Sequence, residues 1–158
     1  MKLGKILYAT DFSASSELAL EYASTLAAAT GATLLVVHVD DETPGLVFGN
    51  VGYGYVPKVD EIARQQYDRL LQVRPASPQV PYEHVFMRGE AAEQILQLAA
   101  QELPDVIVIG THGRTGAFRV LMGSVAESLV RQAKCPVMTV KMPIALEDEP
   151  IAGEGGGS

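Results

Sequence analysis

Apolar residues follow two patterns along the first 142 residues of this chain. Short, nearly continuous apolar runs of the kind that strands covered on both faces of a parallel sheet display occur at 5–9, 32–39, 80–87, 105–110 and 135–140. Between them lie longer stretches with an apolar residue every three or four positions, at 15–30, 59–73, 90–102 and from 124 onward. The pattern therefore predicts five strands that alternate with four helices.

The first of these helices is rich in small residues. Its stripe combines Leu18, Tyr22 and Leu26 with alanines at every fourth position, and Gly31 follows it as a stop signal. A longer connection at 43–57 contains four glycines, two tyrosines and a phenylalanine. A lid, an oligomer contact and plain disorder all remain open for this connection.

Alternating strands and helices imply right-handed crossovers and an α/β fold, with an open, Rossmann-like, doubly wound parallel sheet. Ligands bind such sheets beyond the carboxyl ends of the strands, where the strand order reverses. We place this point between the first and the fourth strand. The prediction brings the turn at Ala9, Thr10 and Asp11 close to the glycine-containing loop that begins at Gly110.

That loop has the features of a phosphate site. Glycines at 110, 113 and 116 permit positive φ angles and let backbone N–H groups approach an anion. Ser124 and Glu127 have the spacing of a capping box, which predicts a helix whose N-terminus also attracts anions. The alternative is that the glycines serve only to make tight turns.

The spacing Gly110-x2-Gly113, nine residues, Gly123-Ser124 resembles the G-2x-G-9x-G-(S/T) signature of ATP-binding universal stress proteins. Residues 5–13 look like the first strand and acidic turn of that family, and 135–140 look like its last strand. The resemblance covers roughly residues 1–142, which we take as one domain. It implies the strand order 3-2-1-4-5.

The resemblance also implies a set of nucleotide-binding positions. It places Asp11 at the nucleotide and gives the main chain of Val39 to adenine, whereas the residues alone leave Asp11 as a ribose ligand, a metal ligand or a helix cap. Phosphate contacts would come from the glycine signature and the N–H of Val125, with Ile109 lining the pocket. Arg114 and Arg119 are the two bases inside the loop, and either could offset phosphate charge, with a solvated side chain as the alternative for Arg119. The full set is Ala9, Thr10, Asp11, Val39, Ile109, Gly110, Gly113, Arg114, Gly123, Ser124 and Val125.

Two histidines and the single cysteine have more ordinary interpretations. We interpret His38, inside an apolar run, as a structural histidine or one near the sheet edge rather than a ligand. For His112 a structural role is favoured over that of general base, because no partnered nucleophile is visible. Cys135 reads as a small buried hydrophobe, and one cysteine suits a reducing compartment.

Composition narrows the classes of partner. The chain has 158 residues, of which 47% are hydrophobic, and a net charge of −7, which argues against nucleic acid as the main partner. No run is long enough to cross a membrane and no signal peptide is evident, so we expect a cytoplasmic protein. Residues 143–158 hold four acids and no base, and they read as a disordered, Gly-rich tail.

We therefore expect a regulatory, stress-response protein that holds ATP or another adenine nucleotide, together with Mg²⁺. The alternatives are a slow ATPase or nucleotidyl-transfer enzyme, and a scaffold that acts without nucleotide. The chain lacks the Walker motif G-x4-G-K-(S/T), so hydrolysis of that type is unsupported. The family resemblance further implies a homodimer formed through the last strand, from Pro136 to Lys141.

Overall fold

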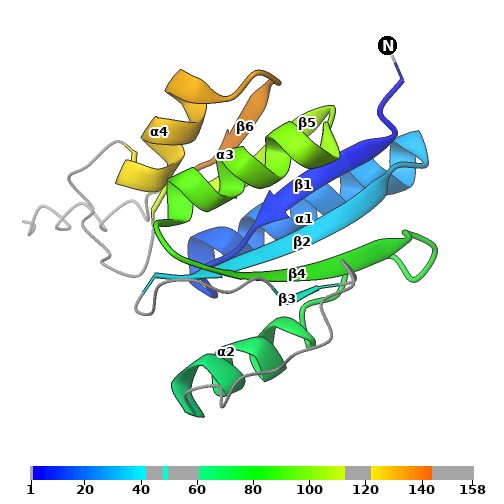
Figure 1. Cartoon of the computed structure of the whole chain (residues 1–158). Coiled ribbons are helices and arrows are strands. Elements are labelled where there is room, and N and C mark those ends of the chain that lie inside the picture. The colour runs from blue at the N-terminus through cyan, green and yellow to red at the C-terminus, as the bar shows by residue number, and fades with distance from the viewer. Residues whose placement is uncertain (1, 42–47, 50–60, 113–121, 144–158) are drawn as a thin grey trace, which may run out of the picture.

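The computed structural model describes residues 2–41, 48–49, 61–112 and 122–143, with the backbone alone at 48–49. Strands and helices alternate over most of this range, as the apolar pattern predicts (Figure 1). The elements are β1 (Lys5–Ala9), α1 (Ala14–Thr30), β2 (Thr33–Asp40), β3 (Phe48–Gly49), α2 (Glu61–Leu70), β4 (Tyr82–Arg88), α3 (Ala91–Glu102), β5 (Val106–Gly110), α4 (Ser124–Gln132) and β6 (Val137–Val140).

The sheet has the order β3-β4-β2-β1-β5-β6. Its five longer strands are parallel, and in chain order they give the predicted arrangement 3-2-1-4-5. The prediction of five strands was incomplete, because the two-residue strand β3 pairs antiparallel with β4 inside the stretch expected to be a loop. Two residues carry no detectable alternation, which is why the apolar pattern missed this strand.

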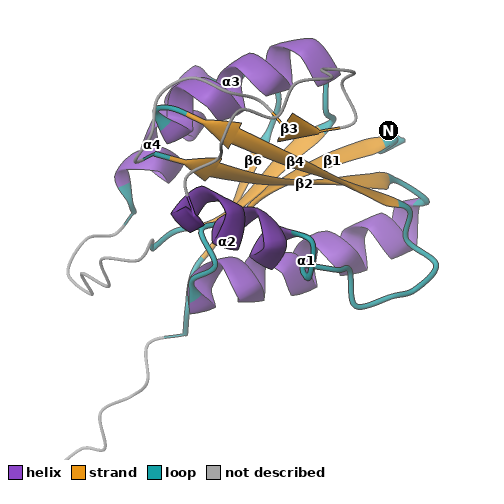
Figure 2. Cartoon of the chain, turned by 60° about the horizontal axis from the view of Figure 1, so that its bottom comes forward, coloured by secondary structure: helices purple, strands orange, loops and turns teal. Residues whose placement is uncertain are grey.

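Helices cover both faces of the sheet (Figure 2). On one face α1 and α2 pack against side chains such as Ile6, Tyr8 and Val36. On the other face α3 and α4 cover side chains such as Leu7 and Val37. Consecutive strand residues thus enter opposite cores, as expected for a strand buried on both sides.

Alanines rather than large residues form the buried face of α1. Ala19, Ala23 and Ala27 are fully buried, whereas Tyr22, which the predicted apolar stripe includes, is 55% exposed and does not belong to the buried face. Small side chains let the helix lie close to the sheet. The helix ends as predicted, with Gly31 in the left-handed conformation at φ 73°.

None of the helices in the described ranges is both long and apolar enough to span a membrane.

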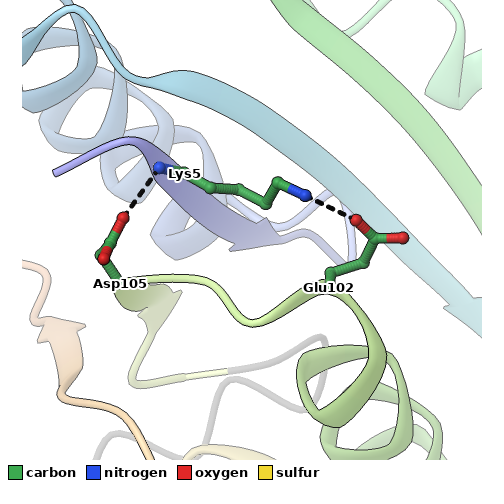
Figure 3. Close-up of polar contacts among 3 residues, drawn as sticks. All are labelled: Lys5, Glu102 and Asp105. Carbon is green, nitrogen blue, oxygen red and sulfur yellow. Dashed lines mark hydrogen bonds and ion pairs between the residues drawn. The ribbon is translucent and has the colours of Figure 1, made fainter.

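A carboxylate ties the start of β1 to the start of β5 (Figure 3). Asp105 Oδ2 accepts hydrogen bonds from the backbone N–H groups of Gly4, at 2.7 Å, and Lys5, at 2.9 Å. The Lys5 ammonium group forms a separate, partly exposed ion pair with Glu102 at 2.7 Å. The hydrogen bonds from Lys5 and Gly4 lower the pKa of Asp105, because they favour its charged form.

We expect Asp105→Asn to lower the free energy of unfolding at about pH 7, because the amide keeps the shape of the carboxylate but loses its charge. Because the pKa of Asp105 is lower in the folded state, its ionisation stabilises the folded protein at pH values above the unfolded pKa of about 3.9. This contribution to the free energy of unfolding is lost at lower pH. The difference between the two proteins in urea unfolding should therefore shrink as the pH falls below about 4. A constant difference down to about pH 2 would contradict this role. Glu102→Gln, which removes only the exposed pair, is the control with little expected effect.

Candidate functional site

A cavity of about 560 Å³ opens at the carboxyl ends of β1, β2 and β5. The starts of α3 and α4 form its other walls. This volume falls within the range of about 300–1,000 Å³ that is typical of small-molecule sites. It also lies between β1 and β5, where the order of the parallel strands reverses, as the topology rule predicts.

Nine of the eleven residues proposed from the sequence line this cavity. They are Ala9, Thr10, Asp11, Val39, Ile109, Gly110, Gly123, Ser124 and Val125. The other two, Gly113 and Arg114, lie outside the described residues, as does most of the connection at 43–57. Strand register explains much of this grouping, since Ala9 pairs with both Val37 and Ile109 in neighbouring strands.

Asp11 lies in the turn between β1 and α1, where it braces the start of the helix. Its Oδ1 atom accepts from the N–H of Ser13 at 3.0 Å and from the hydroxyl of Ser16 at 3.1 Å. Ser13 itself is the N-cap and accepts from the N–H of Ser16. Both bonds of the carboxylate end on Oδ1, so within the described part of the chain Oδ2 stays available to a ligand.

Tyr8 supports the same helix start from the core. Its hydroxyl donates to the carbonyl oxygen of Ser16 at 2.6 Å. Burial raises the pKa of Tyr8 to about 12, and hydrogen bonds with Thr10 and Ser16 oppose that rise. The phenol therefore stays protonated and keeps donating at any physiological pH.

Gly110 is required for close packing rather than for an unusual backbone angle. The only glycines with positive φ in the described ranges are Gly31 and Gly89. A Cβ atom on Gly110 would lie 2.8 Å from the backbone carbonyl carbon and oxygen of Ser15 in α1. The expectation of positive φ at Gly110 is therefore wrong, and this glycine instead lets the first turn of α1 approach the end of β5.

The predicted capping box at the start of α4 is also wrong. The N-cap is Gly123, which has no side chain to cap the helix, and Ser124 is already the first helical residue. Gly123 has φ −67° and ψ 158°, an extended conformation open to any residue type. Glycine here therefore leaves the first N–H groups of α4 without a side-chain cap at a point where Gly123, Ser124, Val125 and Ala126 line the cavity.

The other two helices with described caps differ from α4 in this respect. Ser13 caps α1, and the carboxylate of Glu90 accepts from the N–H groups of Ala92 and Glu93 at the start of α3. The positive end of the α3 dipole is thus already matched by a negative charge. Among the residues that the structure describes, α4 is therefore the one of these three helix starts whose first N–H groups face the cavity without a side-chain cap.

Most of the apolar wall of the cavity was not predicted from the sequence. Val37, Ala91, Ile95 and Ala126 line it beside Val39 and Ile109. Val37 was predictable, because alternation along β2 puts it on the same face as Val39. Ala91 and Ile95 belong to α3, and only the packing of that helix over the sheet brings them here. The cavity thus combines an apolar wall with a polar rim that also includes Ser16, Asp41, Thr111 and His112.

The histidines and the cysteine occupy largely structural positions. His38 is buried in β2, an interior strand, and both ring nitrogens have oxygen partners, so the structural interpretation is right and the sheet-edge alternative is wrong. His112 lines the cavity, and its Nδ1 lies 2.9 Å from the hydroxyl of Thr111. Burial raises the pKa of Cys135, which fits a packed thiol rather than a reactive one.

Comparison with known proteins places this arrangement in a family. The sequence model described as "Universal stress protein family" matches residues 2–141. A universal stress protein of Thermus aquaticus is 35% identical over 140 residues, which cover 86% of this chain and 97% of the relative. A second relative, from Methanocaldococcus jannaschii, is 32% identical over 142 residues and covers 88% of this chain and 82% of its own length.

Solved structures agree on the fold. Universal stress protein UspA from Lactobacillus plantarum superposes with a TM-score of 0.68 at 23% identity, covering 89% of this chain and 99% of that one. The universal stress protein from Archaeoglobus fulgidus in complex with dAMP gives a TM-score of 0.64 at 25% identity, covering 89% of this chain and 100% of that one. A universal stress protein in complex with cAMP gives 0.60 at 24% identity, covering 90% and 100%. Because the family model spans nearly all of the chain up to residue 141, the chain belongs to the universal stress protein family.

Proposed function

We propose that this protein binds an adenine nucleotide in the cavity at the carboxyl ends of β1, β2 and β5. The observation that carries the proposal is the uncapped N-terminus of α4, which lies in the wall of a cavity of about 560 Å³ opposite an apolar surface. A nucleotide needs both features, because its phosphates are anionic and its base is largely apolar. The related structures with dAMP and cAMP support the class of ligand.

The phosphates would lie at the start of α4. Backbone N–H groups of Ser124 and Val125, together with the Ser124 hydroxyl, supply donors there, and the helix dipole adds favourable charge. Gly123 leaves room for the anion because it has no Cβ. Gly113 and Arg114, outside the described residues, would complete the phosphate site.

The base and the ribose would occupy the β1–β2 side of the cavity. The main chain of Val39 would contact adenine against the apolar wall that includes Ile95 and Ala126. Oδ2 of Asp11 would accept from ribose hydroxyls or share a metal ion with the phosphates. Mg²⁺ would bind together with the nucleotide, because this ion is usually held by one or two carboxylates and the phosphates of a substrate.

We further propose that the preferred ligand is ATP with Mg²⁺, and that the protein is a cytoplasmic regulator whose conformation or association responds to the nucleotide during stress. The spacing of Gly110, Gly113, Gly123 and Ser124 supports ATP, since it matches the ATP-binding signature of the family.

The pair Gly123→Asn and Gly123→Asp tests the phosphate site without damaging the fold. Both side chains are good N-caps and the backbone angles suit them, so both variants should melt at the parental temperature or slightly above it. Both should weaken binding of Mg-ATP in calorimetric titration, because the new cap occupies the N–H groups. Asp should weaken it further by charge repulsion, by about tenfold or more relative to Asn.

Ser124→Ala serves as the milder control, since it removes one hydroxyl and leaves the backbone donors in place. A modest loss of affinity is expected. If Gly123→Asn and Gly123→Asp both fold and bind Mg-ATP like the parent, the phosphates do not lie at α4 and the proposal fails.

We also propose that β6 pairs with its counterpart in a second copy, giving a symmetric homodimer. Support comes from the position of β6 at the end of the sheet order, where one backbone edge has no partner strand in the described part of the chain. Unpaired edges favour association.

Thr139, exposed on β6, offers a test, because Thr139→Lys places a charge in the proposed interface. Light scattering across dilution should find a dimer for the parent and a monomer for the variant, whereas a parent that remains monomeric at high micromolar concentration would rule out the dimer.

A further inference from the structure

The turn that carries Asp11 contains an unusual backbone conformation. Phe12 has φ 64°, and the only other described residue besides glycine with positive φ is Leu103. A bulky residue adopts this conformation only where its surroundings hold it. The turn between Asp11 and α1 is therefore fixed by contacts beyond its own sequence.

Side chains from β2 and α2 provide those contacts. The ring of Phe12 stacks on that of His38, with centroids 4.3 Å apart, and the guanidinium group of Arg69 lies 4.6 Å above the Phe12 ring. The His38 ring also lies near the ring of Phe86 in β4, with centroids 5.7 Å apart. Phe12 thus contacts a strand residue and a helix residue that are both distant from it in sequence.

His38 also binds the backbone of the turn directly. Its Nδ1 lies 2.8 Å from the carbonyl oxygen of Thr10, and its Nε2 lies 2.9 Å from the side-chain amide oxygen of Gln66 in α2. A carbonyl oxygen only accepts, so Nδ1 carries a proton. The amide of Gln66 can turn to present either its oxygen or its nitrogen, so it satisfies Nε2 whether or not that atom is protonated.

We propose that His38 is a positioning residue for ligand binding: supported by Gln66, it holds the Thr10–Phe12 turn so that Asp11 faces the cavity. His38 lies outside the cavity lining, and Thr10 and Asp11 belong to it. The hydrogen bonds within the turn, from Phe12 N–H to the Thr10 hydroxyl and from Ser13 N–H to Asp11, depend on this geometry. The inference rests on the proposed function in so far as the ligand is an adenine nucleotide.

Two substitutions of His38 separate positioning from packing. In His38→Asn the amide nitrogen takes the place of Nδ1 and can still donate to Thr10. In His38→Gln the longer side chain places its amide near the position of Nε2, where it meets Gln66 but loses Thr10. Both put a neutral amide in the same buried position, so a purely structural role predicts similar destabilisation for the two. A positioning role instead predicts that His38→Asn keeps the turn in place and retains ligand binding, whereas His38→Gln loses both.

Two measurements read out the result in folded protein. In ¹⁵N NMR spectra without ligand, His38→Gln should shift the amide resonances of Phe12 and Ser13 and speed their exchange with solvent, and His38→Asn should leave them close to those of the parent. In calorimetry with Mg-ATP, His38→Gln should lose about tenfold or more in affinity, in the range seen when a ligand-holding group loses its support, and His38→Asn less than about threefold.

The outcomes keep the two proposals apart. If the parent does not bind Mg-ATP, the proposed function fails, and the amide resonances still decide whether His38 positions the turn. If Phe12 and Ser13 respond equally to both substitutions or to neither, the positioning role is overturned. The same holds if the parent binds Mg-ATP and both variants bind it with equal affinity.

Discussion

The structure depends on one topological constraint, the reversal of strand order between β1 and β5. Because the connections of a parallel sheet are right-handed, the helix after β1 crosses one face and the helix after β5 crosses the other. The two connections diverge as they leave the sheet, and the space between them is the cavity. The order of the strands therefore creates the space for the site.

Close packing then shapes this space. Alanines at 19, 23 and 27 let α1 approach the sheet, and Gly110 lets the first turn of α1 approach the end of β5. Gly123 does not serve close packing in this way. Because it has no side chain, it leaves the start of α4 without a side-chain cap. Two glycines of one signature thus have different physical effects: Gly110 permits close packing, and Gly123 leaves backbone donors that, in the proposed function, would bind the phosphates.

The sequence predicted the fold well because apolar periodicity depends on burial, and the interior strands β1, β2 and β5 are buried over nearly their whole length. It predicted the grouping of Asp11, Val39 and Ser124 through topology and family resemblance together. It missed details that depend on tertiary packing: the short strand β3, the exposure of Tyr22, the cap at Gly123, and the contribution of Ala91 and Ile95 to the cavity. Thr10 and Gln66 each lie 28 residues from His38 in the sequence, so no local sequence pattern indicates their hydrogen bonds with it.

Titration of the ¹⁵N-labelled protein with adenosine and with Mg-ATP, followed by amide resonances, is the sharpest test of the claim that the base binds near Val39 and the phosphates at the start of α4. Adenosine should shift the resonance of Val39 and its neighbours and leave those of Ser124 and Val125 nearly unchanged. Mg-ATP should shift both groups, with the largest changes at Ser124 and Val125, because the phosphates would lie at the start of α4. The claim would be contradicted by shifts confined to another surface, or by no shift at millimolar nucleotide.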